Sequence, residues 1–347
     1  MVKIITVKNK YEDDEIKKKE GHWFDKKDID ILVKSDTILK KKTNNGYKVI
    51  AIFKKKYIEP ELNKLAFKCY HKAAMPSRGR GAAAGLINKK SVYWDKRIPV
   101  NIDKWSTSYI VNGEKSKMKV NNQVASNVIG FYEATPFLNL PPRMTNYTRT
   151  HLEKVKEGLP YIEKLDKFYN ENVPEIYKIQ KKRAMKRNEL RIPKTAFSTI
   201  TVNRNFRTGL HRDAGNFTEG FAVMSVLERG RYKGGFTLFP QYGIAFDIRE
   251  GDCLVFDNTK EWHCNTDFIE SEKDKIYNNN LEDIYKDNPE VGTAGLDKKF
   301  TRISFVAYLR EKILESPYID HNYLIGFDHK SKKKNIKKNN KKSVKNN

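Results

Sequence analysis

Residues 235–256 read GFTLFPQYGIAFDIREGDCLVF, and their pattern indicates the secondary structure of the second half of the chain. It contains three short apolar runs, 235–239, 244–248 and 253–256, which are separated by glycine-containing turns. Short runs of β-branched and aromatic residues bounded by glycine are typical of strands joined by hairpin turns. The stretch therefore predicts a unit built mainly from β-strands.

The same pattern continues on both sides of this stretch, in the runs 197–202, 221–227 and 303–309. Such a series of short strands predicts a β-sandwich or a jelly-roll barrel. Between residues 150 and 190, apolar residues recur at helical spacing and are interrupted by prolines. We expect two or three amphipathic helices there, packed on the β unit.

The chain has 347 residues and a formal net charge of +25. Hydrophobic residues make up 38% and aromatic residues 12%, which is enough for a buried core and excludes a fully disordered chain. No apolar run approaches the roughly 20 residues that span a bilayer, and no apolar signal segment stands at the N-terminus. Cys69, Cys253 and Cys264 are scattered without zinc-binding spacing, as is typical of a reducing compartment. We expect an intracellular protein, nuclear if the cell or the virus host is eukaryotic and cytoplasmic otherwise.

Basic residues are densest in the segment 330–347, which holds nine lysines and no acidic residue. We expect this segment to be a disordered tail, which leaves a charge of +16 for the rest of the chain. The charge favours a polyanionic partner, because each phosphate that a basic side chain neutralises releases a counterion. A nuclear-localisation signal and a nucleic-acid-binding arm both remain open as the role of the tail.

One group of residues has the composition of a catalytic metal site. His211-Arg212-Asp213 follows one predicted strand, and His263 follows another. On a strand, residues 211 and 213 would point to one side and Arg212 to the other. Two imidazoles and one carboxylate can occupy one face of an octahedral iron and leave three positions open for small ligands.

Arg302, a positively charged residue, lies within a later apolar run that is predicted to be a strand. An inward-facing arginine needs an anionic partner, and the distal carboxylate of a small diacid can provide one through a bidentate pair. A residue at the rim of a barrel, paired with an aspartate of the protein, is the structural alternative. Arg310 is the nearest rival, because it follows at an even offset at the end of the same run.

Together these motifs resemble the iron- and 2-oxoglutarate-dependent dioxygenases, and within them the TET/JBP nucleic-acid base oxygenases. The resemblance covers residues 197–310. It rests on FSTITVN at 197–203, HRDAGN at 211–216, the GGxxxFP turn at 234–240, GD at 251–252, WHCNT at 262–266 and TRIS at 301–304. Upstream, RGRGAAAG at 78–85 and the segment around Leu159-Pro160 match more loosely.

The resemblance implies an α+β fold whose core is a double-stranded β-helix, of the jelly-roll or cupin type, flanked by helices. It implies Fe(2+) as the cofactor, with 2-oxoglutarate and O2 as co-substrates. The metal ligands, which would also be the catalytic residues, would be His211, Asp213 and His263. The residues at the co-substrate would be Arg302, on its distal carboxylate, with Asn203 and Ser304.

The same resemblance implies hydroxylation of the methyl group of a pyrimidine base in DNA, either 5-methylcytosine or thymine. A base in a duplex must be flipped out to reach such a site. Asn216 matches a position that approaches the target base, although an Asx-type turn would also explain it. Arg78 and Arg80 are candidates for contacts to phosphates, and a solvated basic loop is the alternative for both. The same chemistry on RNA or on a protein side chain remains an alternative, as does a catalytically silent nucleic-acid-binding module. We expect no membrane partner.

We divide the chain accordingly. The predicted parts are a basic N-terminal accessory region (1–65), a mixed, largely helical support region (66–194), the catalytic core (195–312) with an inserted acidic loop (267–299), a C-terminal segment (313–329) and the lysine-rich tail (330–347). The inserted loop separates His263 from Arg302 by 39 residues. A lid, a partner surface and a disordered excursion are all compatible with its composition.

Overall fold

The computed structural model describes residues 2–89, 94, 97–135, 140–286, 295–296 and 298–315. The predicted tail (330–347) and most of the predicted C-terminal segment (313–329) lie outside the described residues. Within the described part of the chain, no helix is long and apolar enough to cross a bilayer.

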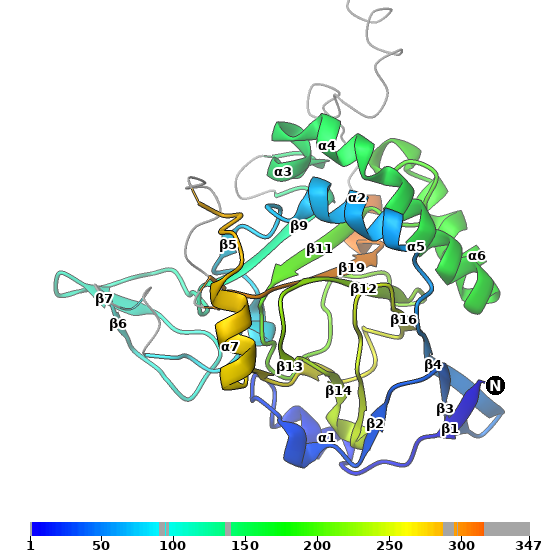
Figure 1. Ribbon diagram of the computed structural model, residues 1–347, viewed down its shortest axis with the longest axis horizontal. Coiled ribbons are helices and arrows are strands. Elements are labelled where there is room, and N and C mark those ends of the chain that lie inside the picture. The colour runs from blue at the N-terminus through cyan, green and yellow to red at the C-terminus, as the bar shows by residue number, and fades with distance from the viewer. Residues whose placement is uncertain are drawn as a thin grey trace, which may run out of the picture.

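A large mixed sheet runs through the centre of the molecule (Figure 1). Its strands in spatial order are β1 (Lys3–Thr6), β3 (Thr37–Thr43), β4 (Gly46–Lys54), β16 (Cys253–Phe256), β12 (Ala222–Arg229), β19 (Thr301–Tyr308), β11 (Thr199–Arg204), β9 (Val124–Tyr132) and β10 (Arg143–Met144), with β5 (Pro76–Ser77) also paired to β9. The pairings are antiparallel except that of β1 with β3. Most residues of β12 and β19 are buried on both faces of the sheet, which explains why their sequences read as nearly continuous apolar runs.

A second, smaller sheet packs against one face of the large sheet. Its order is β17 (Cys264–Asn265), β14 (Thr237–Phe239), β15 (Ile244–Phe246) and β2 (Ile31–Val33). Phe246 of the small sheet meets Phe53 of the large sheet edge to face, with ring centroids 5.3 Å apart, and Phe239 meets Phe256 at 5.7 Å. Each buried phenylalanine contributes about 1.5–3 kcal/mol. The strands predicted between residues 197 and 309 are thus confirmed, and the fold is a mixed α+β fold.

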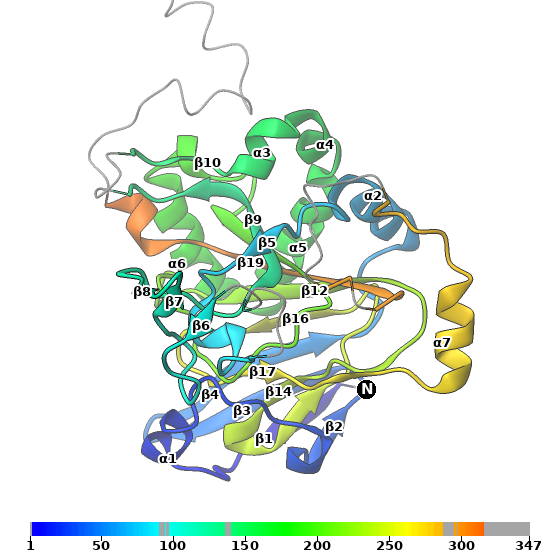
Figure 2. The same cartoon turned by 90° about the vertical axis from the view of Figure 1, so that its left-hand side faces the viewer.

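Helices cover the other face of the large sheet, as Figures 1 and 2 show. They are α2 (Pro60–Tyr70), α3 (Asn146–Thr150), α4 (Leu152–Glu157), α5 (Leu159–Asn172) and α6 (Pro174–Met185). Tyr161 of α5 packs edge to face on Phe305 of β19, with centroids 5.4 Å apart. The helices predicted between residues 150 and 190 are confirmed, and Pro174 begins α6 instead of interrupting a helix, because the first turn of a helix needs no amide hydrogen from the proline.

The N-terminal strands extend both sheets. Strand β4 pairs with β16 of the large sheet, and β2 pairs in parallel with β15 of the small sheet. Between them, the short helix α1 (Asp13–Lys17) packs through Ile16, which is fully buried with Leu210 and Trp262. The first 65 residues therefore build part of the same core as the later strands.

Two segments stand at the edge of this core. A small sheet of β6 (Ile98–Pro99), β7 (Tyr109–Val111) and β8 (Glu114–Lys115) projects from one end of the molecule (Figure 1). The predicted inserted loop contains β18 (Phe268–Ile269), which pairs with β13 (Lys233–Gly234), and the helix α7 (Glu272–Asn279). Helix α7 is tied to the core because the Asn278 side chain donates to the Arg231 carbonyl at 2.7 Å.

Candidate metal centre and pocket

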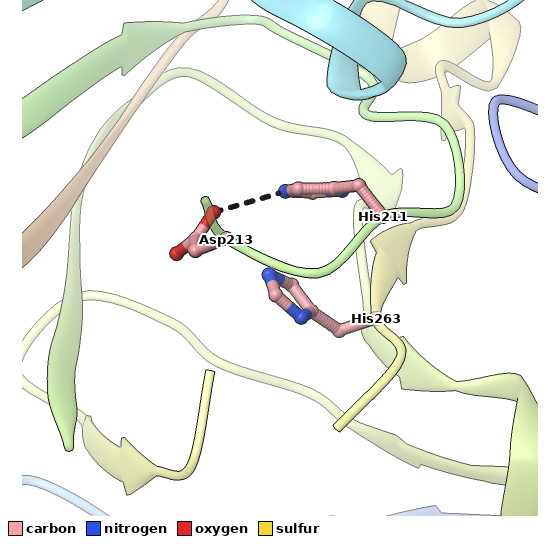
Figure 3. A group of neighbouring side chains, drawn as sticks. All are labelled: His211, Asp213 and His263. Atoms are coloured by element: carbon pink, nitrogen blue, oxygen red, sulfur yellow. Dashed lines mark ion pairs between the residues drawn. The ribbon is translucent and has the colours of Figure 1, made fainter. Parts of the chain in front are cut away.

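The two predicted histidines lie side by side on paired backbone. His211 and His263 form an isolated antiparallel bridge in which each amide donates to the other residue's carbonyl at 3.0 Å. Asp213 completes the group, and Figure 3 shows its carboxylate turned toward both rings. One ligand atom from each of the three side chains lies within 4.8 Å of the others, and His211 Nε2 is 3.4 Å from Asp213 Oδ1.

The expectation that residues 211 to 213 form a strand is wrong. Of the three residues 211 to 213, only His211 takes part in a β-bridge, with His263, and Asp213 lies in the loop that follows. The Asp213 amide donates to the Asn258 carbonyl at 2.9 Å, so a turn against residue 258, and not strand alternation, brings the carboxylate to the histidines. The predicted convergence of the three side chains is confirmed, but its predicted cause is not.

Backbone carbonyls determine which ring nitrogens face the centre. His211 Nδ1 lies 2.8 Å from the Gly209 carbonyl oxygen, and His263 Nδ1 lies 2.9 Å from that of Glu261. A carbonyl oxygen only accepts, so each Nδ1 carries a hydrogen and each Nε2 is the ring nitrogen that faces the centre. When both Nε2 atoms are free of hydrogen, the three residues present two neutral nitrogen donors and one carboxylate, which fits a divalent transition metal.

The charges at the centre are also suited to a cation. Burial would raise the pKa of Asp213, but its interactions with His211 and His263 outweigh burial and lower that pKa below the usual range. Burial, followed by repulsion from His211, lowers the pKa of His263 to about 4. Asn258 Nδ2 donates to Asp213 Oδ2 at 2.6 Å and orients the carboxylate. The sequence pattern did not single out Asn258, because only the folded loop brings it to Asp213.

The three residues line a pocket of about 380 Å³. Several other predicted site residues line it as well. They are Asn203, Ser304, Asn216 and Arg80. Phe206, Met224, Phe256 and Val306 supply apolar walls, so the pocket can hold a small organic molecule next to the candidate metal ligands.

A family model described as the oxygenase domain of the 2OGFeDO superfamily, Tet_JBP, matches residues 128–311. The chain belongs to this family. JBP2 of Leishmania infantum, a bifunctional helicase and thymine dioxygenase, is 31% identical over 195 residues, which are 55% of this chain and 15% of that protein. JBP1 of Trypanosoma brucei brucei, a thymine dioxygenase, is 34% identical over 155 residues, 44% of this chain and 18% of that protein. The chain therefore spans less than a fifth of the length of either relative.

Among solved structures, NgTET1 in complex with 5mC DNA aligns over 97% of this chain and 90% of that chain, with a TM-score of 0.43 and 11% sequence identity.

Two polar residues that were predicted for the co-substrate meet in the pocket of this Tet_JBP chain. Asn203 on β11 and Ser304 on β19 are register partners, and Asn203 Nδ2 donates to Ser304 Oγ at 3.3 Å. The Ser126 hydroxyl of β9 donates to Asn203 Oδ1 at 2.5 Å. Three adjacent strands of the large sheet thus place one polar group each on the same wall.

Arg302 is buried beside this wall but is not among the residues that line the pocket. It is 2% exposed, and its guanidinium carbon lies 5.7 Å from the centroid of the Phe268 ring. Its Nε and Nη2 have no hydrogen-bond partner among the described residues. A buried guanidinium with unused donors can hold an additional anion.

The rival arginine is already paired. Arg310 forms a bidentate ion pair with Glu133, in which Nη2 lies 2.7 Å from Oε1. The Asn216 backbone forms a bridge with Arg310 at the pocket wall, while Asn216 Nδ2 has no partner among the described residues. Arg302 is thus better placed than Arg310 to receive an anion.

The two upstream arginines differ in position. Arg78 is exposed, whereas Arg80 is half-buried and lines the pocket. Desolvation lowers the pKa of Arg80, and its Nε has no partner among the described residues. Arg80 therefore lies inside the cavity, at a place where the sequence alone predicted only a contact to the nucleic-acid backbone.

Proposed function

We propose that this Tet_JBP chain is an iron(II)- and 2-oxoglutarate-dependent dioxygenase that hydroxylates the methyl group of a pyrimidine base in DNA. We favour thymine, because relatives with 31% and 34% identity are thymine dioxygenases, and 5-methylcytosine is the second candidate. The observation that carries the proposal is the convergence of His211, Asp213 and His263 on one pocket, with both Nε2 atoms available.

We propose that the two sheets are the halves of a double-stranded β-helix. After β12 in the large sheet the chain passes through β14 and β15 in the small sheet, returns to the large sheet at β16, and enters the small sheet again at β17. It then returns to the large sheet at β19. Such alternation is the winding expected of a jelly roll. The bridge between His211 and His263 lies at the end of the small sheet, next to β17.

His211, Asp213 and His263 would hold the iron. The donor set of two imidazole nitrogens and one carboxylate leaves half of an octahedron open. The iron, when bound, supplies the oxidation of the C–H bond by dioxygen coupled to the oxidative decarboxylation of 2-oxoglutarate to succinate. The protein holds each ligand in place: carbonyls of residues 209 and 261 hold the rings, and Asn258 holds the carboxylate.

Arg302 would bind the distal carboxylate of 2-oxoglutarate. The support is its burial together with the unused Nε and Nη2 donors, which would cost stability in the absence of an anion. Asn203 and Ser304 would contact the same molecule from the adjacent wall. The apolar walls around them would keep water away from the reacting atoms.

The DNA would approach from the side on which Arg80 and the projecting β6–β8 sheet lie. Asn121 ties these parts together, since it accepts from the Gly81 amide at 2.9 Å and donates to the Trp105 carbonyl at 2.9 Å. The outer part of this region carries exposed basic side chains, Lys115, Lys117 and Lys119. Cations of this kind can hold the phosphate backbone while one base is flipped into the pocket, and Arg78 would contribute at the rim.

Product analysis tests the proposal. The chain is incubated with Fe(2+), 2-oxoglutarate and duplex DNA that contains either unmodified thymine or 5-methylcytosine, and nucleosides and succinate are quantified by mass spectrometry. We expect stoichiometric succinate and hydroxymethyl base on one of the two DNAs. If succinate formed only in the presence of RNA or peptides, the substrate would be RNA or protein and not DNA. If the chain did not bind 2-oxoglutarate, it would be a nucleic-acid-binding module without this activity.

A further inference from the structure

The two residues beside the candidate metal ligands contact each other. Arg212 lies between His211 and Asp213, and Trp262 directly precedes His263. The guanidinium carbon of Arg212 lies 4.5 Å from the centroid of the Trp262 ring. This contact joins the two backbone segments that carry the three ligands, in addition to the bridge between the histidines.

A carboxylate from the N-terminal region completes this contact. Trp262 Nε1 donates to Asp13 Oδ1 at 3.0 Å, and the Arg212 guanidinium forms an ion pair with the same carboxylate. The hydrogen bonds from Trp262 and Arg212 more than offset desolvation, so the pKa of Asp13 lies below its usual value. One side chain of α1 thus holds the neighbours of all three candidate ligands.

The segment that carries Asp13 is itself held against the same loop. Ile16, one turn along α1, is fully buried in a cluster with Leu210 and Trp262. The Gly21 amide donates to the Leu210 carbonyl at 2.8 Å, and the Leu210 amide donates to the His22 carbonyl at 2.8 Å. Asp13 is therefore attached to a rigid support and not to a loose N-terminal arm.

We propose that Asp13 is a positioning residue for the metal centre, acting through Arg212 and Trp262 on the geometry of His211, Asp213 and His263. The inference rests on the proposed metal site, but it concerns a residue outside the stretch 128–311 that matches the family. If Asp13 only stabilised the N-terminal segment, its loss would lower thermal stability and leave metal binding unchanged. If it positions the ligands, its loss weakens and distorts the metal site in a folded protein.

The chain offers a matched control in Asp14. It is the next residue of α1, it is exposed, and its carboxylate makes no hydrogen bond or ion pair among the described residues. Asp13→Asn and Asp14→Asn remove the same charge from the first turn of the same helix, so they lose the same interaction with the helix dipole. Trp262→Phe keeps an aromatic ring for Arg212 but removes the Nε1 hydrogen that Asp13 accepts.

The experiment titrates Co(2+) into the full-length metal-free chain and follows the visible ligand-field absorption. We expect Asp13→Asn to raise the dissociation constant for Co(2+) roughly fivefold to tenfold and to alter the intensity of the band. The effect should be smaller than the roughly 10-fold to 100-fold loss typical of residues that contact a metal ligand directly, because Asp13 acts through Arg212 and Trp262. Trp262→Phe should change the dissociation constant and the band intensity in the same direction as Asp13→Asn. Asp14→Asn should bind Co(2+) like the unmodified chain, and Asp13→Glu should restore part of the affinity that Asp13→Asn loses. Thermal melting of the metal-free variants verifies that each is folded.

The outcomes separate the inference from the proposed function. If the wild-type protein gave no Co(2+) absorption band, neither the metal site nor the positioning role of Asp13 would stand. A normal wild-type spectrum with equal affinities for Asp13→Asn and Asp14→Asn would overturn the positioning role alone. If Asp13→Asn fails to fold, an unchanged affinity and spectrum in Trp262→Phe would overturn it instead.

Discussion

Three arginines near the pocket differ in the partner that each has. Arg310 is paired with Glu133, Arg212 is paired with Asp13, and Arg302 is buried with two donors that no described residue accepts. A paired guanidinium has its charge already balanced, whereas an unpaired buried one favours an incoming anion. At this scale the partner of each side chain, more than its residue type, indicates its role.

Loss of the Arg302 guanidinium should weaken 2-oxoglutarate binding. We expect Arg302→Gln to raise its dissociation constant about 10-fold to 100-fold, because a charge-assisted hydrogen bond contributes roughly 1.5–3 kcal/mol. The dissociation constant of Arg302→Lys should lie between those of the unmodified chain and Arg302→Gln, since lysine keeps the charge but lacks the planar guanidinium. Calorimetric titration of 2-oxoglutarate into the metal-loaded protein measures this, and equal affinities in all three proteins would exclude Arg302 as the anchor.

Replacing the carboxylate ligand should separate chemistry from DNA retention. We expect Asp213→Ala to abolish turnover, because the metal loses its only anionic ligand in the group, while DNA binding stays nearly unchanged. Mass spectrometry of the bases and a gel-shift titration measure the two effects. Parallel loss of both in a folded variant would show that the metal centre and the DNA surface are not independent.

Among the elements, the projecting β6–β8 sheet combines charge with exposed apolar side chains. Ile98 is 66% exposed and Met118 is 69% exposed, and lysines follow at positions 115, 117 and 119. Asn121, which follows the sheet, is hydrogen-bonded to Gly81 and Trp105 of the pocket wall and so anchors the sheet next to the cavity. An element of this composition suits a polyanion that also presents apolar base edges.

Neutralising this element should reduce the salt dependence of DNA binding. Changing Lys115, Lys117 and Lys119 to glutamine should lower the slope of log affinity against log salt by about 2–3, at roughly 0.9 per lost phosphate contact. The matched control changes Lys178 and Lys182 on α6 and Lys186 at its C-cap. Helix α6 lies at the other end of the long axis in Figure 1. If the two triple variants showed the same slope of log affinity against log salt, the DNA would not bind at the β6–β8 sheet.

At the scale of the whole molecule, the N-terminal strands complete the sheets that hold the site. Strand β4 pairs with β16 along four residues, and Phe53 of β4 packs on Phe246 of the small sheet. Without β4, the edge of β16 and its apolar neighbours would be open to solvent and to other chains. We therefore expect the N-terminal region to be required for folding as well as for the contact that Asp13 makes.

Two deletions test this requirement. Removing residues 2–56 should give an insoluble or unfolded protein, because it exposes a sheet edge and a cluster of buried side chains. Removing residues 2–6 should leave a soluble, folded protein, since β1 is a largely exposed edge strand. Soluble yield and thermal melting by circular dichroism provide the measurement, and a stable 57–347 fragment would contradict the expectation.

Local patterns in the chain were enough to identify the strands between residues 197 and 309, the helices after residue 150 and the three residues that converge as candidate ligands. These features depend on periodicity and on short motifs, which neighbouring residues set. The turn that aims Asp213, its partner Asn258, the place of Arg80 inside the cavity and the reach of Asp13 to Arg212 and Trp262 came only from the folded chain. Each of these depends on a contact between segments far apart in sequence, and no local propensity encodes which distant segments will meet.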